Sequence, residues 1–292
     1  MAVEPFGFTA VSIGLAVAVL LSWRSRRKRT LSKSGAVAGF TVGLALVSTG
    51  MRGLILFYFY QLGTWATKYK LQQKMKLDET VEQGSERGAT QVLCVSIIAL
   101  SLSLIHAIYC GPELSIDFSL SKNQSLASHL TCGILAHHAT SLADTLASEM
   151  GIMANKSPFL ITQPWKRVPP GTNGGVTITG LLWSLVGGLL IGILYVITDW
   201  VGGTLPVHPI ATISFASVCG LLGSVLDSFL GAVAQATYFD TQIKKVVHTS
   251  RGGIAIQLIS GTNLLTNEQV NLVSTALTTF LGGWVLAPIF FS

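Results

Sequence analysis

This sequence contains few charged residues. Only 11% of its 292 residues are Asp, Glu, Lys or Arg, whereas a soluble domain contains about 25%. Hydrophobic residues make up 50% and the mean hydropathy is +0.58. These values exclude an ordinary soluble protein. They indicate an all-α, multi-pass membrane protein with one membrane domain, residues 1–292, and no sizeable soluble part.

Other absences narrow the chemistry. The chain has four cysteines, none spaced as C-x-x-C, so we expect small buried hydrophobes and not a redox or zinc motif. It has no P-loop and no kinase-type glycine loop, which excludes a soluble nucleotide-binding domain as the source of any chemistry.

The amino terminus lacks the features of a cleaved leader. Glu4 precedes the first apolar stretch and the cations follow it, unlike a secretory signal. Nothing rich in Arg and Ser precedes that stretch, unlike a transit peptide. We expect residues 1–33 to form a signal anchor and basic loop, which favours the plasma membrane or endoplasmic reticulum over a plastid.

Apolar segments predict about eight transmembrane helices, with seven to nine as the range. The second and third are short for a crossing, and Gly50, Arg52 and Gly53 mark a tight turn between them. A single bent segment is the alternative there. The eight segments are 6–22, 34–49, 51–65, 91–110, 125–147, 176–198, 209–236 and 271–290.

The cations gather in four loops, which hold 17 of the 19 Lys and Arg residues. Eight spans with both termini outside place all four loops in the cytoplasm, as the positive-inside rule requires. The net charge of +6 therefore reflects membrane orientation, and we expect no nucleic-acid partner. The loops are 23–33, 66–90, 148–175 and 237–270.

Two apolar segments carry polar stripes that end in an acid. His137, Thr140, Asp144 and Ser148 fall within an arc of about 80° on a helix. Ser224, Asp227, Ser228, Gly231 and Gln235 form the second stripe at spacings of three and four. Acids in a membrane are costly and usually functional. The bland alternative is hydrogen bonding between helices, which also explains His137, and Asp199 is expected to be an interface residue.

Three acids, Asp144, Glu149 and Asp227, are expected at one depth and form the predicted metal site. Mg²⁺ prefers oxygen ligands and substrate phosphates. Glu149 lies about 140° from Asp144 around an ideal helix. Both can therefore bind one ion only if the helix frays or breaks near Gly151.

A basic, glycine-rich loop, K-R-V-P-P-G-T-N-G-G at 166–175, follows the first stripe. Lys166, Arg167 and the backbone N–H groups of Gly171 to Gly175, including Gly174, suit phosphate oxygens. Lys244, Lys245 and Arg251 offer a second cationic loop. Asn263, Asn267 and Asn271 are candidates to orient a sugar, base or phosphate. Positioning and charge neutralisation of this kind are the main needs of phosphoryl transfer.

A short motif that occurs twice in the sequence indicates an internal repeat. Gly171-Thr172-Asn173 follows the first acidic stripe and Gly261-Thr262-Asn263 follows the second, each before an apolar span. Two related helix–loop–helix units would each provide an acid and then a Gly/Asn loop. Chance is the alternative for two short matches.

Several motifs together resemble the transmembrane protein 19 family, which includes the plant phytyl-phosphate kinase and archaeal relatives. The resemblance runs from about residue 34 to 280, so residues 34–292 are the family core. The D-T-x-A-S pattern also resembles dolichol and phytol kinases, which use CTP. The motifs are A-D-T-L-A-S-E-M-G (143–151), P-x-L-I-T (158–162), G-T-N-G-G-V-T (171–177), G-S-V-L-D-S-F-L-G-A (223–232) and the stretch from Asn267 to Asn271.

The resemblance implies a CTP- and Mg²⁺-dependent prenyl-phosphate kinase that takes a lipid-phase prenyl phosphate to its diphosphate at the cytoplasmic face. It assigns catalytic roles to Asp144, Asp227 and Lys166, metal binding to Asp144, Glu149 and Asp227, and nucleotide binding to the remaining sites. Those sites are Arg167, Gly171, Thr172, Asn173, Gly174, Ser228, Asn267 and Asn271.

Three departures from the family pattern favour an alternative. Ala143, Leu146 and Thr266 stand where relatives often have Gly, Trp and Asp. A plant branch of the family is associated with sugar-responsive regulation, so a non-catalytic membrane regulator is the second hypothesis. A transporter is the third, although the acids lie near one face and not at the midplane where transporters bind.

Overall fold

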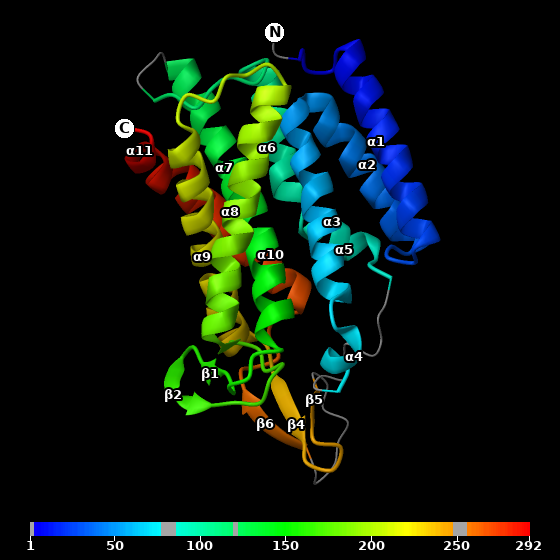
Figure 1. Cartoon of the computed structure of the whole chain (residues 1–292), viewed down its shortest axis with the longest axis vertical. Helices are drawn as coiled ribbons and strands as arrows, with labels where there is room; N and C mark the ends of the chain where they lie inside the picture. Colours follow the sequence, from blue (N-terminus) through cyan, green and yellow to red (C-terminus); the bar gives the residue numbers. More distant parts are fainter. Residues whose placement is uncertain (1–2, 77–85, 119–121, 248–255) are drawn as a thin grey trace.

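The computed structural model describes residues 3–76, 86–118, 122–247 and 256–292, and it is mainly helical. Two short three-stranded sheets lie at one end of the helical bundle (Figure 1). In chain order the helices are α1 Phe8–Arg27, α2 Lys33–Thr49, the 3-10 helix η1 Met51–Leu54, α3 Ile55–Lys68, α4 Leu71–Lys74, α5 Ala89–Cys94, α6 Ile97–Tyr109, α7 Lys122–Gly151, α8 Ile178–Val201, α9 Pro209–Ala234, α10 Asn267–Phe280, the π-helix η2 Leu281–Leu286 and α11 Ala287–Phe290.

Every predicted apolar segment lies mainly on helix, but four helical stretches in the described chain are long and apolar enough to cross a membrane. They are α1, α8, α9 and the continuous stretch Asn267–Phe290. Eight crossings therefore remain a prediction. Segments two and three are separate helices joined by η1, so the single bent segment is not formed.

Segment 91–110 is not one helix. It breaks between α5 and α6, where Ser96 is fully buried. The Ser96 hydroxyl donates to the carbonyl of Val92 over 2.7 Å. The carbonyl of Val95, at the break, accepts a hydrogen bond from the His137 ring over 2.9 Å. The break therefore exchanges local helical bonds for a bond to α7.

The centre of the bundle is the meeting of α7, α8 and α9, where small residues let the backbones touch. A Cβ on Gly187 of α8 would fall 2.6 Å from the Cα of Ala143 on α7. A Cβ on Gly220 of α9 would fall 3.0 Å from the Cβ of Ala143 and 2.9 Å from the Cα of Gly188. Close backbone approach through small residues is how membrane helices gain packing energy.

Each sheet is formed by the segment of the chain that connects two helices, α7 to α8 for the first sheet and α9 to α10 for the second. The first comprises β1 Phe159–Leu160, β2 Gln163–Arg167 and β3 Gly175–Val176, in the order β2-β1-β3. The second comprises β4 Thr237–Asp240, β5 Lys245–Val247 and β6 Ile256–Ser260, in the order β5-β4-β6. All pairings are antiparallel, and in each sheet the first strand is central.

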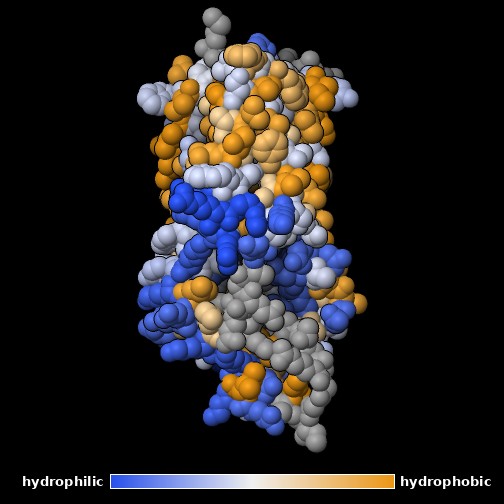
Figure 2. Space-filling model, turned by 90° about the vertical axis from the view of Figure 1, so that its right-hand side faces the viewer, coloured by the Kyte–Doolittle hydropathy of each residue, from blue (hydrophilic) through white to orange (hydrophobic). Residues whose placement is uncertain are grey.

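Both chain ends lie at the end of the bundle opposite the sheets (Figure 1). The face that carries α1 has apolar surface toward the chain ends and a hydrophilic band near its middle, followed by a largely hydrophilic region toward the sheets (Figure 2). On this face the end of the bundle that carries the sheets therefore extends beyond the apolar surface.

The contact of Gly187 with α7 is tested by Gly187→Ala. The added Cβ would meet backbone at 2.6 Å, so α7 and α8 must move apart, and we expect a loss of about 1–3 kcal/mol. Gly43→Ala on α2 is the matched control, because its Cβ would meet only Ala18 at 4.0 Å. Thermal unfolding in detergent should show a lower midpoint for Gly187→Ala alone; equal midpoints would refute the close contact.

Candidate functional site

Asp227 lies on α9 opposite one polar face of α10. The hydroxyl of Ser274 donates to Oδ2 of Asp227 over 2.7 Å. With its amide nitrogen toward the acid, Asn271 donates to the same oxygen over 3.1 Å and to the carbonyl of Asn267 over 3.3 Å. Asn267, Asn271 and Ser274 follow one another at spacings of four and three, which places them on one face of the helix.

Asp144 lies at the same height on α7. Thr140 of α7 faces Gly223 of α9, since a Cβ on Gly223 would meet the Thr140 side chain at 2.2 Å. Asp144 and Asp227 each come four residues after that contact, one helical turn further along. The two carboxylates are close enough to interact electrostatically, and both residues are half-buried.

The surroundings of Asp144 distinguish it from the other buried charges. Its carboxylate forms no hydrogen bond or ion pair with any residue that the structure describes. An acid placed beside a second acid, and left without a cation, is unfavourable unless a cation or proton joins them. The pair Asp144–Asp227 is therefore the part of the described chain best suited to receive a cation.

Thr266 shows why α10 begins where it does. Its hydroxyl accepts from the N–H of Gln269 over 3.3 Å, while the Gln269 side chain accepts from the N–H of Thr266 over 2.9 Å. This is a capping box, in which Thr and Asp are both good N-cap residues. Thr266 in place of Asp therefore retains the helix start and does not remove an acid from the Asp144–Asp227 pair.

Ala143 also has a packing explanation. It is fully buried against Gly187 and Gly220, where only a small side chain fits. Alanine therefore takes the place that relatives often give to glycine without displacing Asp144. Leu146 is 1% exposed and belongs to the hydrophobic core.

Glu149 does not join the two aspartates. Helix α7 continues unbroken to Gly151, so the condition under which Asp144 and Glu149 could share one metal is not met. Instead, Oε2 of Glu149 accepts from the ammonium of Lys74 over 2.6 Å. Lys74 is 1% exposed and also donates to the carbonyl of Ala66 over 2.7 Å. This ion pair links α4 to the carboxyl end of α7.

We expect Glu149→Gln to destabilise the protein, because it leaves the buried ammonium of Lys74 without its counter-charge, at a cost of about 3 kcal/mol. Glu86→Gln is the matched control. Glu86 pairs with Arg26 at 2.9 Å while about a third exposed, and such pairs contribute less than about 1 kcal/mol. Thermal unfolding and limited proteolysis after Lys76 should separate the two variants. Unchanged stability together with lost metal affinity would instead make Glu149 a metal ligand.

The basic glycine-rich loop is docked on the far end of α9. Gly174 has φ +75°, and a Cβ there would fall 2.3 Å from the Cβ of Ala232. The N–H of Asn173 donates to the hydroxyl of Thr237 over 3.1 Å. Thr172 bonds within the loop, its hydroxyl donating to the carbonyl of Pro169 over 2.7 Å. Glycine is needed at 174 both for its dihedral angle and for this close approach.

The two loop cations are directed to backbone carbonyls. Nζ of Lys166 on β2 donates to the carbonyl of Ile259 on β6 over 3.0 Å. This hydrogen bond links the two sheets. The guanidinium of Arg167 donates to the carbonyl of Ser157 over 3.0 Å. Both retain unused N–H groups, since an ammonium has three donors and a guanidinium five.

The other predicted residues are spread around this end. Ser228 is half-buried beside Asp227, while Asn263 and Asn267 are exposed. Gly171 has φ +88° and starts the turn toward β3, and Gly261 in the second G-T-N has φ +73°. Arg251 lies outside the described residues. His137 is fully buried, and its bond to Val95 supports the packing interpretation of this histidine.

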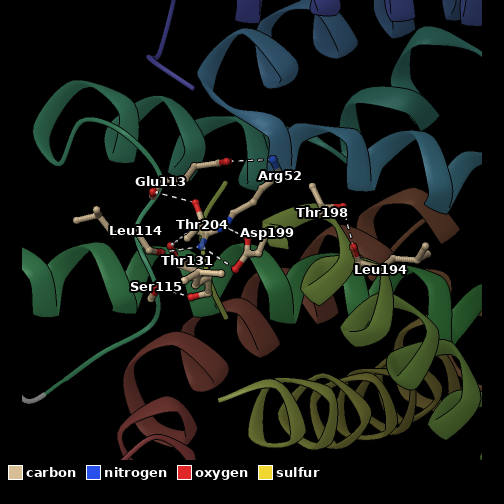
Figure 3. Close-up of polar contacts among 10 residues, drawn as sticks. Arg52, Glu113, Leu114, Ser115, Thr131, Leu194, Thr198, Asp199 and Thr204 are labelled. Carbon is tan, nitrogen blue, oxygen red and sulfur yellow. Dashed lines mark hydrogen bonds and ion pairs between the residues drawn. The ribbon is translucent and has the colours of Figure 1, made fainter. Parts of the chain in front are cut away.

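A second buried charge cluster, which sequence reasoning missed, lies around η1 and the carboxyl end of α8, at the end of the bundle opposite the sheets (Figure 1). Figure 3 shows its contacts. Arg52 forms two bonds to Asp199, with Nε at 2.7 Å from Oδ1 and Nη2 at 3.1 Å from Oδ2. Its other bonds go to the Thr131 hydroxyl at 3.2 Å and the Leu114 carbonyl at 2.7 Å. Asp199, expected to be an interface residue, is 4% exposed.

Glu113 completes the cluster from the loop after α6. Its Oε1 accepts from the backbone N–H of Arg52 over 2.9 Å (Figure 3). Burial raises the pKa of the Glu113 carboxyl, and the charge of Arg52 opposes that rise. Gly50 leaves the space that Glu113 fills, since a Cβ there would fall 2.4 Å from it. The acceptors that surround Arg52 come from α8, from α7 and from the loop after α6. The cluster therefore joins η1 to these elements and has a structural role.

The fold and the half-buried acid pair define a multi-pass helical membrane protein with a polar site at one end. The chain belongs to the family described as integral membrane protein DUF92, which matches residues 16–279. The predicted membrane class is thus confirmed. Membership in the transmembrane protein 19 family stays an interpretation.

Three relatives illustrate the family. Protein PGR of Arabidopsis thaliana is 35% identical over 271 residues, 91% of this chain and 92% of that protein. The uncharacterized membrane protein MJ0933 of Methanocaldococcus jannaschii is 26% identical, covering 92% of each chain. Protein VTE6 of Arabidopsis thaliana, named as chloroplastic, is 22% identical over 78% of this chain and 65% of that protein. A plastid relative leaves a plastid membrane open here. No solved structure matches the chain.

Proposed function

We propose that the protein is a membrane-embedded prenyl-phosphate kinase whose site is the Asp144–Asp227 pair. The observation that carries this is the placement of two half-buried carboxylates at one height, beside the polar face of α10. The resemblance to prenyl-phosphate kinases supplies the reaction. The relation to VTE6 and the family as a whole is compatible with it.

The acid pair fits Mg²⁺ by the chemistry of its donors. Mg²⁺ in phosphoryl-transfer sites is held by one or two carboxylates and completes its shell with phosphates and water. Asp144 and Asp227 are two such carboxylates. Among the described residues no group of three or more His, Cys, Asp and Glu side chains could hold a metal, so substrate phosphates would complete the shell. When bound, Mg²⁺ supplies neutralisation of phosphate charge.

The chain's own residues then have distinct tasks. Ser274 and Asn271 hold the Asp227 carboxylate in position. Asn267 of α10 and Ser228 of α9 would contact the nucleotide, and the loop of Lys166, Arg167 and Asn173 would approach it from the sheet end of the bundle. Fixing both substrates and neutralising charge accounts for most of the catalysis of phosphoryl transfer.

The reaction proposed is balanced as follows. A phosphate oxygen of the prenyl monophosphate attacks the γ-phosphorus of CTP. The bond from that phosphorus to the bridging oxygen breaks, and CDP leaves with the electron pair. The products are prenyl diphosphate and CDP. The lipid substrate enters from the bilayer and the nucleotide from water, which suits a site at the border of the apolar zone.

We expect Asp144→Asn and Asp227→Asn each to lower turnover at least about 100-fold, because each removes a charge that holds the metal and phosphates. The measurement uses purified protein in detergent with Mg²⁺, labelled CTP or ATP, and phytyl, geranylgeranyl and farnesyl monophosphates. Asp240→Asn, in the β4–β5 turn where Oδ1 accepts from the N–H of Gln242, is the matched control and should retain activity. Labelled diphosphate formed equally by all variants would refute the assignment.

The second candidate is a non-catalytic membrane regulator that binds the same phosphates without turnover. Leu146 stands in place of the Trp frequent in relatives, and this departure from the family pattern is the support for the regulator. Stabilisation by CTP with no diphosphate product would support this candidate, whereas turnover would exclude it.

A further inference from the structure

A pocket of about 420 Å³ opens between the carboxyl end of α1 and α3. Arg24 and Lys28 line it from α1 and its C-cap, and Lys68 lines it from α3. No acid is among its lining residues. Within the described chain these three cations form no ion pair, unlike the neighbouring Arg26, which binds Glu86. Among the described residues, the pocket therefore concentrates positive charge that no acid pairs.

Thr64, a residue that lines the pocket, also carries an unsatisfied hydroxyl. Oγ1 of Thr64 is buried and has no hydrogen-bond partner in the described structure. The nearby Tyr60 hydroxyl is already engaged, since it accepts from the Ser25 hydroxyl over 2.8 Å and contacts Thr30. A buried hydroxyl without a partner costs free energy, so rotation of the Thr64 side chain toward a ligand oxygen in the pocket would be favourable.

The pocket has an aromatic rim suited to a membrane surface. Trp65 is 51% exposed and stacks on Tyr69 with ring centroids 5.5 Å apart. Trp side chains of this kind collect where the apolar core of a bilayer meets its headgroups. The hydrophilic band in the middle of this face, next to apolar surface, lies at the height where α1 ends (Figure 2). In a bilayer, lipid phosphates lie close to such a boundary between apolar and polar surface.

The pocket is separate from the Asp144–Asp227 pair. Gly63 of α3 faces α7, where a Cβ would lie 3.6 Å from Thr145. Thr64, Trp65 and Lys68 lie on the other side of α3, about 100–200° around the helix from Gly63. A ligand in the pocket therefore lies across α3 from the proposed kinase site.

We propose that this pocket binds the phosphate of an anionic phospholipid headgroup. Arg24, Lys28 and Lys68 supply the charge, Thr64 donates its hydroxyl to a phosphate oxygen, and Trp65 packs along the glycerol and upper acyl chains. Basic pockets between membrane helices bind lipid headgroups by this combination. The site goes beyond the kinase proposal, and its occupancy requires no nucleotide.

Native mass spectrometry of the detergent-purified full chain tests this, with dioleoyl phosphatidylglycerol as the probe and dioleoyl phosphatidylcholine as the neutral comparison. The double variant Arg24→Gln/Lys68→Gln should bind phosphatidylglycerol at least about tenfold more weakly, which is one decade in Kd. Arg27→Gln/Lys33→Gln removes the same charge outside the pocket and should bind as the native chain does. Thr64→Val should weaken binding by a smaller factor.

Three results would overturn the proposal. They are equal affinity of the two double variants, equal affinity for phosphatidylcholine, and displacement of the lipid by millimolar inorganic phosphate, which would make this a site for free phosphate. Because the readout is lipid binding without CTP, failure here leaves the kinase proposal untouched, and loss of turnover in Asp144→Asn leaves this one untouched.

Discussion

The close approach of α7, α8 and α9 is the constraint from which the position of the site follows. At Ala143, two neighbouring helices present glycine, so the three backbones meet with almost no intervening side chain. A helix that is pinned in this way cannot rotate or slide freely. The residue after Ala143 is Asp144, and the same contact fixes the height of Asp227 one turn beyond Gly223. Packing in the apolar zone therefore determines the geometry of the polar end.

The buried charges divide into two groups by whether they are satisfied. Arg52 is bonded to Asp199, Thr131 and Leu114, and Lys74 is bonded to Glu149 and Ala66. Such pairs hold segments together and leave little capacity for a ligand. Asp144 has a second carboxylate for a neighbour and no cation among the described residues. Incomplete satisfaction is what separates a binding site from a structural ion pair.

The two sheets correspond to the two parts of the sequence in which the G-T-N motif recurs. Each follows an acid-bearing helix, each has its first strand in the centre, and each is accompanied by a G-T-N whose glycine has positive φ. The second loop closes on α9 as the first does: a Cβ on Gly261 would fall 2.0 Å from the carbonyl of Gln235, and one on Gly174 would meet Ala232. Two loops that close on the same helix end in this way favour the predicted internal repeat.

Local pattern and composition were sufficient for the membrane class and for the approximate positions of most helices, because apolar length and a 3.6-residue period are properties of consecutive residues. The break between α5 and α6 was not predicted. The partners of the charges were not predictable in the same way. Nothing near Lys74 indicates Glu149, 75 residues away, and nothing near Arg52 indicates Asp199. Ser274 could have been found, since it continues the spacing of Asn267 and Asn271. The short strands of the two sheets gave no periodic signal, because the longest has five residues.

The central claim is that Asp144 and Asp227 together bind a divalent ion with a nucleotide. Its most direct test is electron paramagnetic resonance of Mn²⁺, which has the same preference for oxygen ligands as Mg²⁺, added to the purified protein with CTP. The account predicts about one protein-bound Mn²⁺ per chain that depends on CTP and is lost in Asp144→Asn and in Asp227→Asn, both still folded. CTP-dependent Mn²⁺ binding that survives both substitutions would contradict it.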